Sequence, residues 1–171
     1  MQCLLRPVQE SDVQLLFDGR NDELVRKNSF SEDRIIFETH KTWFASVLKN
    51  PEVFFYVLEA DENPIGQIRL NKSGNSGVIS YSIAEEYRAQ GYGKLILQLV
   101  ENECVQKNFA DSLIGYVKKS NVASQIIFKS LGYSESDESS FYRYEKIKLC
   151  YTPDLTAPQN KTQWGGCIIP Y

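Results

Sequence analysis

The sequence is poor in the residues that build metal centres. Its 171 residues contain one histidine, and its four cysteines, Cys3, Cys104, Cys150 and Cys167, form no C-x-x-C pair. Because a zinc site takes several histidine and cysteine ligands at short spacings, we expect no metal site. The scattered cysteines are expected to be free thiols in a reducing compartment, and a disulfide pair is the alternative.

Basic charge and long apolar runs are also lacking. A net charge of -3 and a pI near 5.3 give no basic field for nucleic acid, so we expect no nucleic-acid partner. No apolar N-terminal segment or stretch of about 20 apolar residues appears, which predicts a cytoplasmic protein without membrane association. A chain of this length with 42% hydrophobic residues can bury one core, which predicts one main domain.

The hydrophobic pattern predicts one strand, two helices, three strands, a helix, a strand, a helix and two final strands. Ser11 and Gln14 match a capping box at the start of the first helix. The polar stretch 19–34, "GRNDELVRKNSFSEDR", is expected to be a turn-rich connection before a second helix that ends ahead of Pro51. The next three strands, 53–60, 65–70 and 77–84, are joined by short Asn/Gly/Pro-rich connections, which favour antiparallel neighbours.

The stretch "EEYRAQGYGKLI", residues 85–96, places two glycines at a strand-to-helix turn. A triphosphate-binding loop, G-x-x-x-x-G-K-[ST], is excluded because Arg88 and Leu95 stand at required positions. A dinucleotide fingerprint is excluded because Ile96 replaces its third glycine. Two glycines at a helix start still let backbone N–H groups approach an anion, which fits a pyrophosphate; a purely structural turn is the alternative.

The turn and a later segment share the pattern of one family. Arg88-x-x-Gly91-x-Gly93 resembles the acyl-CoA signature of the GCN5-related N-acetyltransferase (GNAT) superfamily, and residues 117–133, "VKKSNVASQIIFKSLGY", resemble a second segment of that superfamily. The likeness runs from about residue 3 to residue 149. It implies an α/β (α+β) fold with a mixed, mostly antiparallel sheet of about seven strands and four helices. We expect an acetyltransferase domain over 1–150 and an irregular tail over 151–171.

The resemblance implies acetyl-CoA as the donor co-substrate. By the same likeness, the cofactor-binding residues are Ile83, Ala84, Arg88, Gln90, Gly91, Tyr92, Gly93, Lys94, Asn121, Ser124 and Phe128. Asn121 is also a good helix N-cap, and Ser124 and Phe128 share a helix face, so capping and packing are the alternatives.

Amine acetylation requires a path for the amine's proton, donors for an oxyanion and an acid for the leaving thiolate. Many members of the superfamily place a tyrosine acid where this chain has Phe128. Tyr81 and Tyr116 are therefore the candidate catalytic phenols, with Glu59 as a candidate base through water. Half-buried sheet tyrosines and a solvated strand-end carboxylate are the alternatives.

The N-terminal half carries a second, narrower resemblance. "RNDELVRKNSF" followed by "HKTWF" resembles the subgroup that acetylates a nucleotide-linked amino sugar in pseudaminic acid synthesis. By that likeness Arg20, Arg26 and His40 would meet phosphate or uracil and Trp43 would stack on a ring. His40 and Trp43 also suit a helix core. The alternatives are a protein N-terminal acetyltransferase, as in relatives that modify ribosomal proteins, and a non-catalytic acyl-CoA-binding module; an oligomer is compatible with each.

Overall fold

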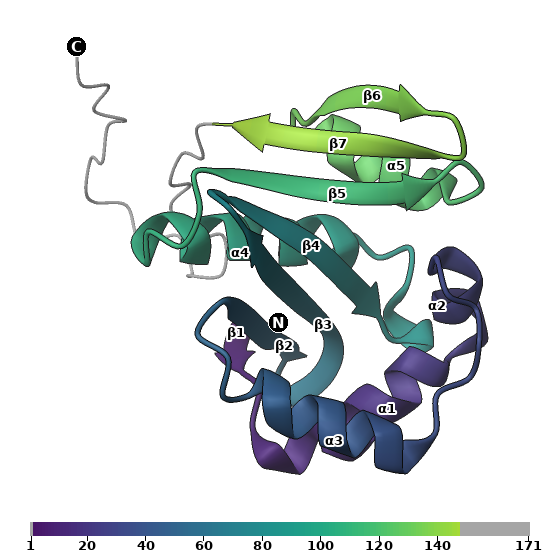
Figure 1. Ribbon diagram of the computed structural model, residues 1–171, viewed down its shortest axis with the longest axis vertical. Coiled ribbons are helices and arrows are strands. Elements are labelled where there is room, and N and C mark those ends of the chain that lie inside the picture. The colour runs from purple at the N-terminus through teal and green to yellow at the C-terminus, as the bar shows by residue number, and fades with distance from the viewer. Residues whose placement is uncertain (1, 148–171) are drawn as a thin grey trace.

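The computed structural model describes residues 2–147 as a sheet with helices on both faces (Figure 1). Its strands are β1 (Cys3–Pro7), β2 (Val53–Ala60), β3 (Asn63–Ser73), β4 (Ser76–Ile83), β5 (Ser112–Lys118), β6 (Ser134–Glu138) and β7 (Phe141–Ile147). Its helices are α1 (Val13–Asn21), α2 (Glu23–Asn28), α3 (Phe37–Val47), α4 (Tyr92–Gln106) and α5 (Val122–Ser130). Short 3-10 turns, Glu10–Asp12 and Glu85–Tyr87, precede α1 and α4.

The strands form one mixed sheet in the order β1-β2-β3-β4-β5-β7-β6. Only the β4–β5 pair is parallel within residues 2–147, and the other neighbours are antiparallel. The predicted fold class, a mostly antiparallel seven-stranded sheet, is therefore confirmed. The short connections do join β2, β3 and β4 as antiparallel neighbours, because they leave no room for a crossover.

The two parallel strands separate before they end. Their ladder stops at Ile79 and Gly115, whereas β4 continues to Ile83 and β5 to Lys118 (Figure 1). Beyond this point the edges of both strands have lost their sheet partner on one side, which is a place where a ligand's polar groups can bind.

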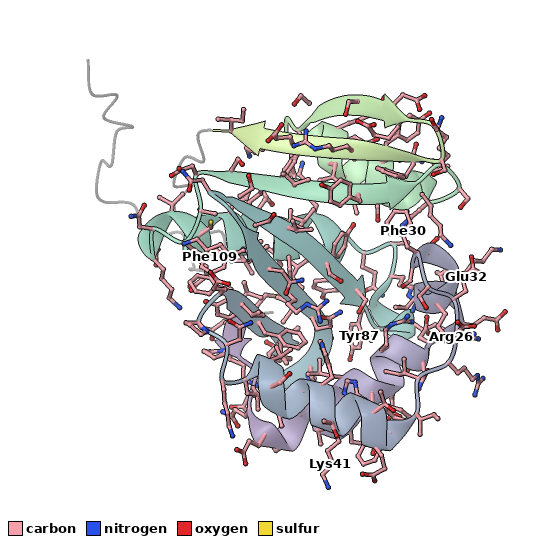
Figure 2. The ribbon with its side chains drawn as sticks, in the orientation of Figure 1. Arg26, Phe30, Glu32, Lys41, Tyr87 and Phe109 are labelled. Atoms are coloured by element: carbon pink, nitrogen blue, oxygen red, sulfur yellow. The ribbon has the colours of Figure 1, made fainter. Side chains whose placement is uncertain are left out.

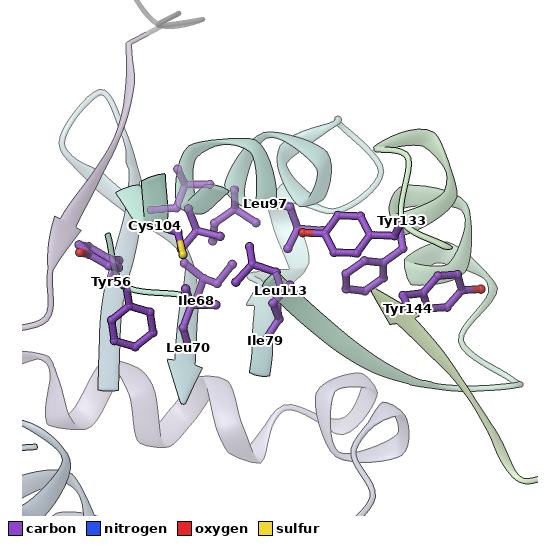
Figure 3. Packing of buried hydrophobic residues seen from close by; sticks show 14 of the residues in the cluster. Tyr56, Ile68, Leu70, Ile79, Leu97, Cys104, Leu113, Tyr133 and Tyr144 are labelled. Atoms are coloured by element: carbon purple, nitrogen blue, oxygen red, sulfur yellow. The ribbon is translucent and has the colours of Figure 1, made fainter. Parts of the chain in front are cut away.

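The main core fills the space between the sheet and α4 and α5 (Figure 3). Ile68 and Leu70 of β3, with Leu97 of α4 and Leu113 of β5, are fully buried there. The ring of Phe128 packs directly beneath Gly115, where an added Cβ would lie 2.4 Å from the ring's Cζ. On the opposite face α3 covers β2. The rings of Phe44 and Phe55 pack edge to face there, with 6.4 Å between their centroids.

Two local predictions for the N-terminal region are wrong. The polar stretch contains α2, because Asp22 caps it by accepting a hydrogen bond from the Val25 N–H at 2.9 Å. No Ser11 capping box forms; instead the Asp12 carboxylate accepts from the Gln9 N–H at 2.7 Å. The cap therefore lies two residues before Ser11, at Gln9 of the 3-10 turn, and Arg6 pairs with the same Asp12 carboxylate at 2.7 Å.

Some predictions lie wholly or partly outside the described residues. The tail over 151–171, Cys150 and Cys167 belong to this group. Cys3 and Cys104 are free and buried. None of the helices within residues 2–147 has the length and apolar character needed to cross a membrane.

Candidate active site

A cleft of about 1060 Å³ occupies the gap between β4 and β5. It runs from the first turns of α4 and α5 to the face of the sheet that α3 covers, and it is large enough for two ligands end to end. Following the expectation from the sequence, we call the end near α4 the donor half and the end near α2 and α3 the acceptor half. Tyr87 of the turn before α4 and Phe30 of the segment after α2 both line the cleft (Figure 2).

The edge of β4 presents backbone groups to this cleft. Ala84 donates its N–H to the Ile65 carbonyl at 2.9 Å, so these two residues form a hydrogen-bonded pair. Hydrogen-bonded and non-hydrogen-bonded pairs alternate along an antiparallel ladder, so the next pair, Gly66 and Ile83, is not hydrogen-bonded. The N–H and C=O of Ile83 therefore point away from β3 and toward the gap, as do those of Tyr81 two residues earlier. The Ile83 N–H is therefore open to a ligand, whereas its carbonyl already accepts from Arg88 at 3.0 Å and the Ala84 N–H is used by Ile65.

The glycine turn forms the N-terminus of α4. Gly91 has a φ of +90° and nothing within 4 Å of its would-be Cβ, so its conformation, not crowding, favours glycine. At Gly93 an added Cβ would lie 2.8 Å from Ile127 Cδ1 of α5, so that side chain would have to shift to accept a larger residue. Neither of their N–H groups has an acceptor among residues 2–147. These donors and the positive end of the helix dipole suit a pyrophosphate.

The remaining side chains of the turn are placed differently. Arg88 donates to the Ile83 carbonyl at 3.0 Å and pairs with Asp22 at 2.7 Å, so its guanidinium is engaged by protein groups. Gln90 donates to the Glu86 carbonyl, and the ring of Tyr92 packs against Tyr87. Lys94 is exposed and forms no ion pair within the described chain. It is therefore the side-chain cation of the turn that can meet a phosphate.

The first turn of α5 joins the cleft to β4. Asn121 caps the helix by accepting from the Ser124 N–H at 3.2 Å, and the Ser124 hydroxyl lies 2.9 Å from the Tyr81 hydroxyl. Phe128 is 1% exposed and stacks on Tyr144 with 5.1 Å between ring centroids. Asn121 therefore has the capping role, and Phe128 packs in the core at the floor of the cleft.

The three candidate catalytic side chains are not brought together. Tyr81 lies inside the cleft, where burial raises the pKa of its phenol and the hydrogen bond with Ser124 opposes that shift. Tyr116 lines the cleft with 42% of its surface exposed. Glu59 lies outside the cleft lining and pairs with Arg6 at 2.5 Å. The geometry therefore does not support Glu59 as a base.

Three of the four predicted acceptor residues line the acceptor half. They are Arg20, His40 and Trp43. The His40 Nε2 lies 3.1 Å from the Val13 carbonyl, and burial lowers the pKa of the imidazole, so the ring is neutral at pH 7. Arg26 is absent from the lining; it donates to the Asn21 and Glu32 carbonyls and thereby holds the segment after α2.

The sequence analysis missed a polar row on the sheet floor of the acceptor half. Gln67, Arg69 and Asn71 of β3 alternate with core residues and line the cleft, beside Ser80 and Ser82 of β4. The signal was present as polar residues at every second position of an inner strand. No aspartate or glutamate occurs in the described cleft lining, which contains Arg20, Arg69, Arg88 and Lys94.

Comparison with known proteins places this geometry in a family. The model of the acetyltransferase (GNAT) domain matches residues 2–134. A prophage-derived N-acetyltransferase of Bacillus subtilis, YokL, is 27% identical over 99 residues. That match covers 56% of this chain and 55% of the relative, so the similar part spans about half of the relative's length.

Solved structures share the fold at low sequence identity. The spermidine N-acetyltransferase from Vibrio cholerae, with CoA and spermine, has a TM-score of 0.80 at 15% identity, covering 86% of this chain and 96% of its own. The aminoglycoside acetyltransferase AAC(6')-Ib with ribostamycin and coenzyme A has 0.76 at 13%, covering 86% and 94%. The ribosomal L7/L12 alpha-N-protein acetyltransferase with coenzyme A has 0.75 at 14%, covering 86% and 95%. With the domain match, these results confirm the predicted family: the chain belongs to the GNAT acetyltransferases, whose donor is acetyl-CoA.

Proposed function

We propose that this chain transfers the acetyl group of acetyl-CoA directly to the amine of a small, nucleotide-linked amino sugar. The donor would lie in the β4–β5 gap with its pyrophosphate at the α4 N-terminus. The N–H groups of Gly91 and Gly93 and the ammonium of Lys94 support this placement. The gap-facing backbone of Ile83 supports an extended pantetheine arm beside β4.

Direct transfer requires few protein groups. The amine nitrogen forms a bond to the thioester carbonyl carbon, and the carbon–sulfur bond breaks. The departing sulfur takes a proton, and the amine loses one to water, since no carboxylate occurs in the described lining. Tyr81 is the group that we assign as the acid. A tyrosine phenol is protonated at neutral pH, burial raises the pKa of Tyr81 further, and the hydrogen bond with Ser124 fixes its position.

The charge of the cleft carries the proposal for the acceptor. Arg20 and Arg69 line the acceptor half, and no carboxylate occurs in the described lining. The other two cations do not add to this charge, because Arg88 is paired with Asp22 and Lys94 lies at the donor end. Polycations such as spermine or an aminoglycoside would be repelled by this lining, whereas the diphosphate of a nucleotide sugar would be attracted. Trp43, 36% exposed in the same half, offers a ring face for a base or sugar.

The shape of the acceptor end supports a small molecule over a peptide. The segment after α2 crosses to β5, where Lys118 donates to the Lys27 carbonyl at 2.9 Å and pairs with Glu32 at 2.5 Å. Phe30 of this segment also contacts Phe141 of β7 at 5.5 Å between centroids. A bridged end favours a pocket over the open groove that a protein N-terminus would use.

A coenzyme-release assay tests the proposal. The acceptor panel is a UDP-linked amino sugar, spermidine, an aminoglycoside and a peptide with a free N-terminus. We expect turnover with the UDP-linked amino sugar and little with the polycations. Preference for spermidine or the peptide would refute the acceptor assignment. Coenzyme binding without turnover on any amine would instead favour a binding module.

A further inference from the structure

Arg69 occupies an unusual position for a charged residue. It lies in the middle of β3, between Phe55 of β2 and Ser80 of β4, on the face of the sheet that α3 covers. Its guanidinium carbon lies 4.9 Å from the ring centroid of Trp43 and 5.8 Å from that of Phe55. The two rings therefore hold the flat cation in place at the cleft floor.

The guanidinium has no anionic partner within residues 2–147. Its Nε is buried without a hydrogen bond, and no ion pair or hydrogen bond of its other nitrogens is formed with these residues. Arg6, Arg88 and Arg143 each pair with a carboxylate. Burial lowers the pKa of Arg69, yet an arginine remains charged at neutral pH.

A charge without a partner is costly in a folded protein unless a ligand supplies one. The contact with Trp43 orients the guanidinium but leaves its N–H donors unused. Asn71 and Ser80 line the cleft beside it and add neutral donors. On the helix side of the same cleft, Arg20 also has a buried nitrogen, Nη1, without a partner.

We infer that Arg69 binds an oxyanion of the acceptor and so determines its class: an amine that also carries a phosphate or a carboxylate. This inference deepens the proposed function and rests on it for the position of the acceptor. The planar fork of the guanidinium can donate two parallel N–H bonds to either oxyanion. Trp43 beside it leaves an aromatic surface for the part of the acceptor next to the anion.

Calorimetric titration of protein saturated with coenzyme A tests the inference, because the coenzyme then fills the pyrophosphate site. The anionic probes are UDP for a phosphate source and galacturonate for a carboxylate source, with uridine and galactose as their neutral counterparts. We expect at least one anionic probe to bind more tightly than its neutral counterpart. In Arg69→Met that probe should lose about 10- to 100-fold in affinity, the worth of charge-assisted hydrogen bonds.

Matched variants separate this role from others. Lys72→Met removes the same charge from an exposed position of the same strand and should leave probe affinity unchanged. Arg69→Lys keeps the charge without the fork and should be intermediate. Coenzyme affinity and melting temperature should be maintained in Arg69→Met, since the variant removes an unpaired buried charge.

Three results would overturn the inference. They are equal probe affinity in wild type and Arg69→Met, no binding of either anionic probe to wild type, and a joint loss of coenzyme affinity and melting temperature, which marks a structural role. The proposed function fails separately, if Arg69-dependent probe binding is present but no amine in the acceptor panel is acetylated.

Discussion

Gly115→Ala tests the contact at which the cleft begins. The new Cβ would lie 2.4, 2.8 and 3.0 Å from Cζ, Cε1 and Cε2 of Phe128. The ring cannot withdraw easily, because it is 1% exposed and packs against Tyr133 at 4.9 Å and Tyr144 at 5.1 Å between centroids. We therefore expect the overpacking cost of a rigid core, about 1–3 kcal/mol of unfolding free energy.

Urea unfolding followed by tryptophan fluorescence measures this loss, with an unchanged m-value as the sign that only stability moved. Phe128→Leu alone leaves a space beneath Gly115 and should itself destabilise. In the double variant the alanine fills part of that space. The two effects should therefore be less than additive, with a coupling of about 1 kcal/mol or more. Additive losses, or a cost below about 0.5 kcal/mol for Gly115→Ala, would refute the reasoning.

Three further predictions concern the site and the effect of pH. Tyr81→Phe should lower kcat about 100-fold or more with little change in the KM for acetyl-CoA, and a wild-type kcat in steady-state assays would remove Tyr81 from the chemistry. Gly91→Asp should bind acetyl-CoA about tenfold or more weakly than Gly91→Asn, because both share the strain at a φ of +90° and only aspartate repels a pyrophosphate; equal affinities by calorimetry would contradict the assigned site. The hydrogen bond from the Arg6 guanidinium lowers the pKa of Asp12 in the folded protein. The ionised Asp12 therefore contributes stability above the unfolded pKa of about 3.9, and this contribution is lost as pH falls through the lower folded pKa. Acid unfolding of Asp12→Asn should accordingly be less steep below about pH 4, and an unchanged slope would show that Asp12 does not govern it.

The glycine turn at the start of α4 was predictable from the sequence, because the groups that we assign to donor binding belong to the backbone. A strand followed by Gly91, Gly93 and a helix places N–H donors at one spot whatever the rest of the fold does. The roles of the side chains in this turn did not follow from the sequence. Arg88 pairs with Asp22, 66 residues earlier in the chain, and no local pattern reveals such a partner.

The acceptor half could be predicted only in part. Arg20 and Trp43 do line the cleft, but Arg26 and Glu59 are engaged by protein groups elsewhere. Arg69 was missed because the alternation along β3 shows only that its side chain lies on the face opposite the main core. It does not show whether that face is exposed to solvent or covered by a helix. That difference depends on α3, which lies on the same face.

The sequence by itself determined the family, the order of the main strands and helices and the glycine turn for the donor, since each rests on local periodicity and on contiguous motifs. Only the tertiary structure decided that Phe128 packs in the core, that the Tyr81 hydroxyl lies 2.9 Å from that of Ser124, and that the cleft holds cations and no carboxylates in its described lining. These facts depend on which distant segments meet across the sheet, and charge pairing and burial are set there.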